Sequence, residues 1–136
     1  MEDLILIVDD ARFARRIETK ALQDAGFEHI VEAKTAKEAL QIFEEQAPEL
    51  TLLDITLPDN SDLTLLRTMI KIRPEAKIVM NSAIGQELIQ FQPPAFRMPQ
   101  ELIIQDALNA GARDFITKPF KEKEFIEKIV KVMKGN

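Results

Sequence analysis

The feature that most constrains the fold is an alternation of short apolar runs with longer stretches whose apolar residues recur at helical spacing. The first run, Leu4 to Val8, is unbroken and rich in β-branched residues. Such runs are typical of strands buried on both faces of a sheet. The runs predict strands at 4–8, 30–33, 50–53, 77–80 and 114–117.

Amphipathic stretches between these runs predict helices. The first is expected over 11–25, with four residues at a spacing of four facing the core: Phe13, Ile17, Ala21 and Ala25. The others are expected from a capping box at Thr35 to before Pro48, from a cap at Asn60 or Ser61 to before Pro74, and over 100–110 and 122–134.

Alternating strands and helices predict an α/β fold: a doubly wound parallel sheet of five strands in the order 2-1-3-4-5, with helices on both faces. The length of 136 residues fits one domain, 1–136. One connection, at about 83–99 before the fourth helix, is longer than loops in compact domains usually are.

Composition excludes several classes of function. Cysteine is absent and His29 is the single histidine, so thiolate sites and histidine-rich zinc sites are excluded, and we interpret His29 as structural. The net charge of −5 argues against nucleic-acid binding. Neither a secretory signal nor a run long enough for membrane insertion is present. We therefore expect a cytoplasmic protein with protein partners.

Acidic residues follow two strands that are neighbours in the predicted order. Asp9 and Asp10 end the first strand, and Asp54 ends the third. Ligands of open parallel sheets bind at the carboxyl ends of the strands, where the strand order reverses. Three carboxylates gathered there would repel one another unless a cation lay between them. Because the ligands are all oxygens, Mg²⁺ is expected, or Mn²⁺ in its place.

The same edge is predicted to gather a hydroxyl and an ammonium, because Ser82 ends the fourth strand and Lys118 the fifth. This set suits transfer of a phosphoryl group to a carboxylate. Asp54, on the central strand, is the expected nucleophile. Ser82 and Lys118 would bind oxygens of the transferred group.

Each residue taken alone has a simpler interpretation. Asp9 or Asp10 would cap the first helix, and Asp54 would begin a turn before Pro58. Ser82 alone is typical of a turn and Lys118 alone of a solvated loop. The functional interpretation depends on all of them falling at strand ends on one edge.

Four motifs, in this order, resemble the receiver domain of two-component response regulators, and in particular its stand-alone, CheY-like chemotaxis type. They are Ile5-Leu6-Ile7-Val8-Asp9-Asp10, Leu53-Asp54-Ile55-Thr56-Leu57-Pro58, Ser82-Ala83, and Gly111 through Thr117-Lys118-Pro119-Phe120. The resemblance runs over nearly the whole chain and implies a flavodoxin-like (CheY-like) fold.

The resemblance implies that Asp54 accepts a phosphoryl group from a phosphohistidine on a sensor histidine kinase or phosphotransfer protein. It adds the backbone carbonyl of Thr56 to the metal ligands Asp9, Asp10 and Asp54. It makes Ser82 and Phe115 the switch residues, with Phe115 turning inward on phosphorylation. It makes the Lys118–Pro119 peptide bond cis. A downstream protein would then bind the face formed by the fourth helix, fifth strand and fifth helix.

Other functions remain open at this stage. A phosphorelay intermediate or phosphate sink would use the same residues, and the chain's end at Asn136 predicts output through protein contacts rather than a DNA-binding domain. An Asp-based phosphohydrolase would need an acid two residues after Asp54, where Thr56 stands. A receiver that binds partners without phosphorylation would not need the acids. Asp62 stands where the family often has glycine.

Overall fold

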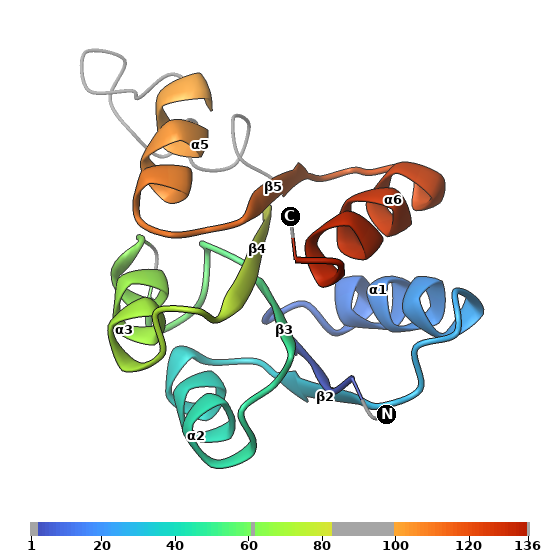
Figure 1. The fold of residues 1–136 in the computed structure, drawn as a ribbon, viewed down its shortest axis with the longest axis horizontal. Helices are drawn as coiled ribbons and strands as arrows, with labels where there is room; N and C mark the ends of the chain where they lie inside the picture. Colours follow the sequence, from blue (N-terminus) through green and yellow to red (C-terminus); the bar gives the residue numbers. More distant parts are fainter. Residues whose placement is uncertain (1–2, 61, 83–99, 136) are drawn as a thin grey trace.

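The computed structural model describes residues 3–60, 62–82 and 100–135. Five parallel strands form one sheet in the order β2-β1-β3-β4-β5 (Figure 1). Their bounds are β1 Ile5–Val8, β2 Ile30–Ala33, β3 Leu50–Leu53, β4 Lys77–Ser82 and β5 Asp114–Thr117. The predicted sheet and strand order are confirmed, and β4 extends two residues beyond its predicted end.

Helices cover both faces of the sheet. They are α1 Arg12–Asp24, α2 Ala36–Gln46, α3 Thr64–Ile72, α5 Gln100–Asn109 and α6 Glu122–Met133. Figure 1 shows α1 and α6 on one face and α2, α3 and α5 on the other. The predicted doubly wound architecture is therefore confirmed, while the long connection at 83–99 lies outside the described residues.

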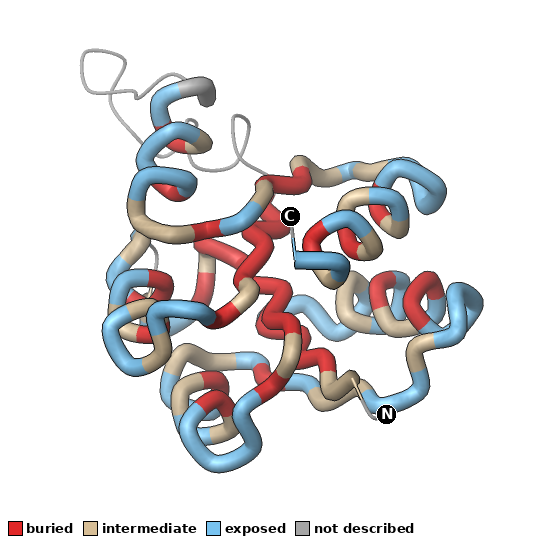
Figure 2. The backbone as a smooth tube through the Cα atoms, viewed as in Figure 1, coloured by how far each residue is buried: buried red, intermediate tan, exposed pale blue. Residues whose placement is uncertain are grey.

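The alternation of side chains along each strand divides the core into two halves. On β1, Leu6 and Val8 pack with the helices of the α2, α3 and α5 face. Ile5 and Ile7 point the other way and pack with α1 and α6. Figure 2 shows the buried strands running through the middle of the molecule. Asp9 and Asp54 thereby follow two strands, β1 and β3, that are buried along their whole length.

The predicted inward face of α1 is confirmed at Ala21 and wrong at its other three positions. Phe13 is 76% exposed and Ile17 44% exposed, and Ala25 lies past the end of the helix. The buried residues are Glu18, Ala21 and Leu22. Two adjacent faces of this helix have residues at helical spacing. The face that packs on the sheet includes the Glu18 carboxylate, and a search for apolar residues alone passes over it.

The start of α3 also differs from the prediction. The N-cap is Leu63, without a side-chain cap, rather than Asn60, and Ser61 lies outside the described residues. The Asp62 carboxylate, one residue before the N-cap, accepts a hydrogen bond from the Thr64 amide at 2.8 Å and so satisfies one free amide of the first turn. Ala47 is the sole non-glycine residue with positive φ in the described ranges, so Asp62 does not adopt the left-handed conformation.

The predicted capping box of α2 is confirmed in its first hydrogen bond, while the second involves the residue before the N-cap. The Thr35 hydroxyl accepts a hydrogen bond from the Glu38 amide at 3.1 Å, and the Glu38 carboxylate accepts one from the Lys34 amide at 3.0 Å.

Within residues 3–60, 62–82 and 100–135, none of the helices combines the length and apolar character needed to cross a bilayer.

The turn after α5 generates a prediction on stability. Gly111 has φ of +118°, and a Cβ atom there would lie 2.9 Å from Ile70 Cγ1. Gly26, after α1, has φ of +100° but open space around it. Gly26→Ala should therefore cost only backbone strain, about 1–2 kcal/mol, and Gly111→Ala that strain plus overpacking of about 1 kcal/mol or more. Urea unfolding of both variants measures the difference, and equal losses would contradict the packing argument.

Candidate functional site

Three carboxylates meet where the carboxyl ends of β1 and β3 lie side by side. One oxygen each of Asp9, Asp10 and Asp54 falls within 4.8 Å of the others. Asp9 is 2% exposed and Asp54 9%, whereas Asp10 is open to solvent. The predicted convergence of these acids is confirmed. It follows from the parallel register, in which Val8 pairs with Leu53 and the next residue of each strand is an aspartate.

The Asp54 carboxylate is oriented by donors on one of its oxygens. Oδ1 accepts the Ser82 hydroxyl at 2.7 Å and the Thr56 amide at 3.0 Å. Ser82 Oγ in turn accepts the Ile55 amide at 2.7 Å, so its donor is directed at Asp54. The predicted proximity of Ser82 and Asp54 is confirmed, and Oδ2 is left facing Lys118.

Lys118 brings a cation into the cluster. Its ammonium contacts the Asp9 carboxylate and lies 3.5 Å from Asp54 Oδ2 and 3.5 Å from Glu18 Oε2. Its amide donates to the Ser82 carbonyl at 3.1 Å, which ties the end of β5 to the end of β4. The Lys118–Pro119 bond is cis, as the family resemblance implies. Lys118 therefore lies in the acid cluster and not in a solvated loop.

Two residues of the site were not predicted from the sequence. Glu18, on the inner face of α1, is 1% exposed, and Asn81, on β4, is 2% exposed. Asn81 Nδ2 donates to Glu18 Oε2 at 2.8 Å. Glu18 adds a fourth carboxylate near the cluster, so Lys118 is surrounded by more negative charge than the strand ends alone supply.

Burial governs the proton affinities of these groups. Removal from water raises the pKa of Asp54, opposed by Lys118 and by the Ser82 hydroxyl. Burial raises the pKa of Glu18 to about 7, again opposed by Lys118. Burial would lower the pKa of Lys118, but the carboxylates of Asp54, Glu18 and Asp9 outweigh it and the pKa is raised. The ammonium therefore stays charged.

The acid cluster fits a divalent cation. Three converging carboxylates provide the oxygen-only donor set that Mg²⁺ and Mn²⁺ prefer, and the exposed Asp10 leaves the cluster open to solvent on one side. Among the described residues, Asp9, Asp10 and Asp54 form the one group of this kind. The Thr56 carbonyl follows the Asp54 strand end, and its role as a ligand stays a prediction.

The simpler interpretations of these residues can now be compared with the structure. Neither Asp9 nor Asp10 caps α1, whose N-cap is Ala11 with no side-chain cap, although Asp9 Oδ1 accepts the Ala11 amide at 2.9 Å. Asp54 does form a turn-like contact, through the Thr56 amide. His29 is exposed and precedes β2, at the opposite end of the strands from the acids.

Phe115 on β5 is 4% exposed and belongs to the core cluster. Together with the Ser82–Asp54 hydrogen bond, this is the arrangement that the sequence-based hypothesis assigns to the phosphorylated chain. Burial of Phe115 therefore does not by itself distinguish the two states of the predicted switch, which stays a prediction.

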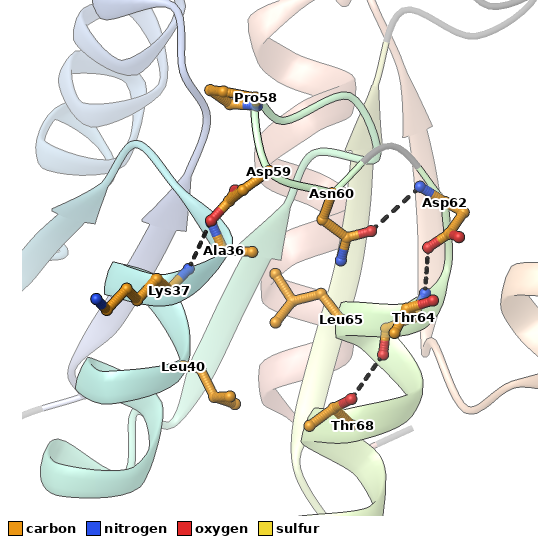
Figure 3. A pocket seen from close by; sticks show the side chains of 10 residues that line it. All are labelled: Ala36, Lys37, Leu40, Pro58, Asp59, Asn60, Asp62, Thr64, Leu65 and Thr68. Carbon is orange, nitrogen blue, oxygen red and sulfur yellow. Dashed lines mark hydrogen bonds between the residues drawn. The ribbon is translucent and has the colours of Figure 1, made fainter.

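A separate open hollow of about 560 Å³ lies between α2 and α3 (Figure 3). Its polar groups already serve the fold: the Asp59 carboxylate accepts the amides of Ala36 and Lys37 at 2.7 and 3.1 Å, and the Thr68 hydroxyl donates to the Thr64 carbonyl at 2.9 Å. None of the clustered acids lines this hollow, so it is distinct from the candidate site.

Comparison with known proteins gives a consistent result. The family model for the response regulator receiver domain matches residues 5–92. Chemotaxis protein CheY of Bacillus subtilis is 38% identical over 98% of this chain and 99% of its own length. Chemotaxis protein CheY of Thermotoga maritima is 36% identical over 96% of this chain and 97% of its own length.

Solved structures agree with these sequence matches. The receiver domain of NtrX from Brucella abortus superposes with a TM-score of 0.80 at 31% identity, covering 97% of this chain and 99% of that one. A CheY-like receiver domain protein from Methanospirillum hungatei gives 0.79 at 29% identity, covering 98% of this chain and 95% of that one.

Glu18 generates a prediction on pH dependence. The folded protein binds this proton with a pKa of about 7, against an ordinary value of 4.5, so stability is lost as the pH rises through this window. Glu18→Gln should remove that slope, and the gap between variant and wild type should grow by up to about 3 kcal/mol, since one pKa unit is about 1.4 kcal/mol.

Urea unfolding of the metal-free proteins at a series of pH values measures this gap. Glu49→Gln, which removes a carboxylate 3.4 Å from Lys77 at the other end of the sheet, is the matched control. Wild type and Glu18→Gln curves that run parallel from pH 4.5 to pH 7 would contradict the prediction.

Proposed function

Because the chain belongs to the response regulator receiver family, we propose that Asp54 accepts a phosphoryl group from a phosphohistidine of a sensor histidine kinase or phosphotransfer protein. The observation that carries this proposal is the placement of the buried Asp54 carboxylate between the other two acids, the Ser82 hydroxyl and the Lys118 ammonium. Members of this family are signalling proteins, and the chemotaxis relatives favour chemotaxis-like signalling over a phosphate sink.

The contacts support a separate role for each side chain in this reaction. Asp54 Oδ2 attacks phosphorus, because Oδ1 is already occupied by two donors. The new P–O bond forms as the P–N bond breaks, and its electron pair returns to the imidazole of the partner. Ser82 and Lys118 then contact oxygens of the acyl phosphate. This is group transfer to the protein itself, with no external turnover substrate.

Asp9, Asp10 and Asp54, with the Thr56 carbonyl, would hold Mg²⁺ or Mn²⁺. Bound there, the cation would neutralise charge on the carboxylates and on the phosphoryl oxygens. The Asp9 carboxylate also contacts Lys118, so it would serve the metal ion and the ammonium at once. The phosphohydrolase alternative lacks a supporting contact, because Thr56 stands where its acid would be.

The output surface is proposed to be α5, β5 and α6. Both helices pack against β5, which carries the buried Phe115. On α5, Leu102 is 52% exposed and Leu108 38% exposed, so this face offers apolar contact area to a protein partner. Lys128 on α6 donates to the Phe115 carbonyl at 2.7 Å and links α6 to the same strand.

The phosphoacceptor proposal predicts labelling by radioactive acetyl phosphate that requires Mg²⁺ and Asp54. Asp54→Asn should reduce the label to background, because an amide oxygen is a poor nucleophile, and a chelator should do the same to wild type. Asp24→Asn, the same change at a surface ion pair with Lys20, should label like wild type. Equal labelling of Asp54→Asn and wild type would place the acceptor elsewhere.

The switch predicts a population shift detectable by NMR. Beryllofluoride with Mg²⁺, a mimic of the phosphoryl group, should shift the backbone amide signals of Phe115 and of α5, because it adds acceptor atoms beside Ser82 on β4, and β4 pairs with β5. The Ile55 amide, bonded to Ser82 Oγ, reports binding, and that of Gly26 serves as the remote control. Shifts at Ile55 without any at Phe115 or α5 would contradict the switch.

A further inference from the structure

Glu18 is a charged residue in a place where an apolar one would be expected. It is 1% exposed, on the face of α1 that also buries Ala21 and Leu22. A carboxylate at such a depth is costly unless it is paired. Replacing a buried polar or ionic pair with apolar residues is often neutral or stabilising, so stability alone does not account for it.

The partners of Glu18 connect it to the candidate site. Asn81 Nδ2 donates to Glu18 Oε2 at 2.8 Å, and the Lys118 ammonium lies 3.5 Å from the same oxygen. Asn81 is a neutral donor, so it fixes the carboxylate without cancelling its charge. The second polar atom of this amide, Asn81 Oδ1, is buried and has no hydrogen-bond partner in the described structure. The amide thus serves Glu18 through its donor.

Lys118 is shared among three carboxylates that are not equivalent. Asp9 and Asp54 also belong to the group that fits a divalent cation, whereas Glu18 does not. A cation bound by Asp9 and Asp54 would weaken their attraction for the ammonium. Of the three carboxylates that contact Lys118, Glu18 alone lies outside the group that fits the cation, so its attraction for the ammonium would not be weakened in this way.

We propose that Glu18, fixed by Asn81, is a positioning residue that holds the Lys118 ammonium at the acid cluster when a divalent cation is bound there. The functional part of this inference rests on the proposed phosphoacceptor role of Asp54. Glu18 acts through Lys118 and touches no reacting atom. It places the ammonium where it can meet a phosphoryl oxygen on Asp54.

A double-mutant cycle tests whether Glu18 acts through Lys118. At pH 8, above the Glu18 pKa of about 7, Glu18→Gln should slow labelling by acetyl phosphate and Mg²⁺ roughly ten-fold, a size typical of coupling within one ion-pair network. In the Lys118→Met background, Glu18→Gln should have no further effect. Glu49→Gln, which removes an equal charge beside Lys77, should label like wild type.

A second variant guards against a folding defect. Glu18→Leu combined with Asn81→Leu replaces the buried polar pair with apolar side chains and is expected to fold. It should label as slowly as Glu18→Gln. A wild-type rate in either variant, a faster rate, or an equal slowing by Glu18→Gln in the Lys118→Met background would overturn the proposal.

A crystal structure of the Mg²⁺-loaded protein gives a readout that does not depend on labelling. The Lys118 Nζ atom should lie within about 4 Å of the Glu18 carboxylate, the usual limit for an ion pair. A cation at the acids with Lys118 turned away from Glu18 would overturn the proposal. Failure of wild type to take any label would instead remove the phosphoacceptor function, and the crystal structure would still decide the placement of Lys118.

Discussion

The site depends on the attraction between one ammonium and the carboxylates around it. Lys118 contacts Asp9 and lies 3.5 Å from both Asp54 and Glu18. Burial, and after it the nearby carboxylates, favours protonation of Asp54 and Glu18, and the pKa of each is raised. Lys118 opposes it, and so keeps negative charge available for a cation and for nucleophilic attack.

The parallel sheet is what brings these groups together. Residues from four positions far apart in the chain meet because every strand ends at the same edge, and because β1 and β3 are neighbours across the reversal of strand order. The two strands that carry the acids, β1 and β3, are buried along their whole length and packed by both halves of the core. The acids are therefore held close in spite of their repulsion, at a cost that the two halves of the core offset.

Much of this could be predicted from the sequence. The strand ends placed Asp9, Asp54, Ser82 and Lys118 on one edge, since apolar runs locate strand ends well. Glu18 could not be predicted in this way, because hydrophobic spacing leaves the rotation of α1 undecided and a glutamate resembles a surface charge. The exposed Phe13 and Ile17 and the buried Glu18 are two results of the same rotation. Glu18 precedes Ala21 and Leu22 by three and four residues, and this helical spacing is the feature of the sequence that could have indicated its burial.

The end of β4 joins the two sides of the site. Asn81 and Ser82 are adjacent, so their side chains leave the strand in opposite directions. Asn81 fixes Glu18, and Ser82 donates to Asp54, while the Ser82 carbonyl accepts the Lys118 amide. A displacement of this dipeptide would therefore alter the acceptor carboxylate and the surroundings of the ammonium together. Because Phe115 on β5 pairs with Met80 of the same strand, such a displacement would also reach the core beneath α5.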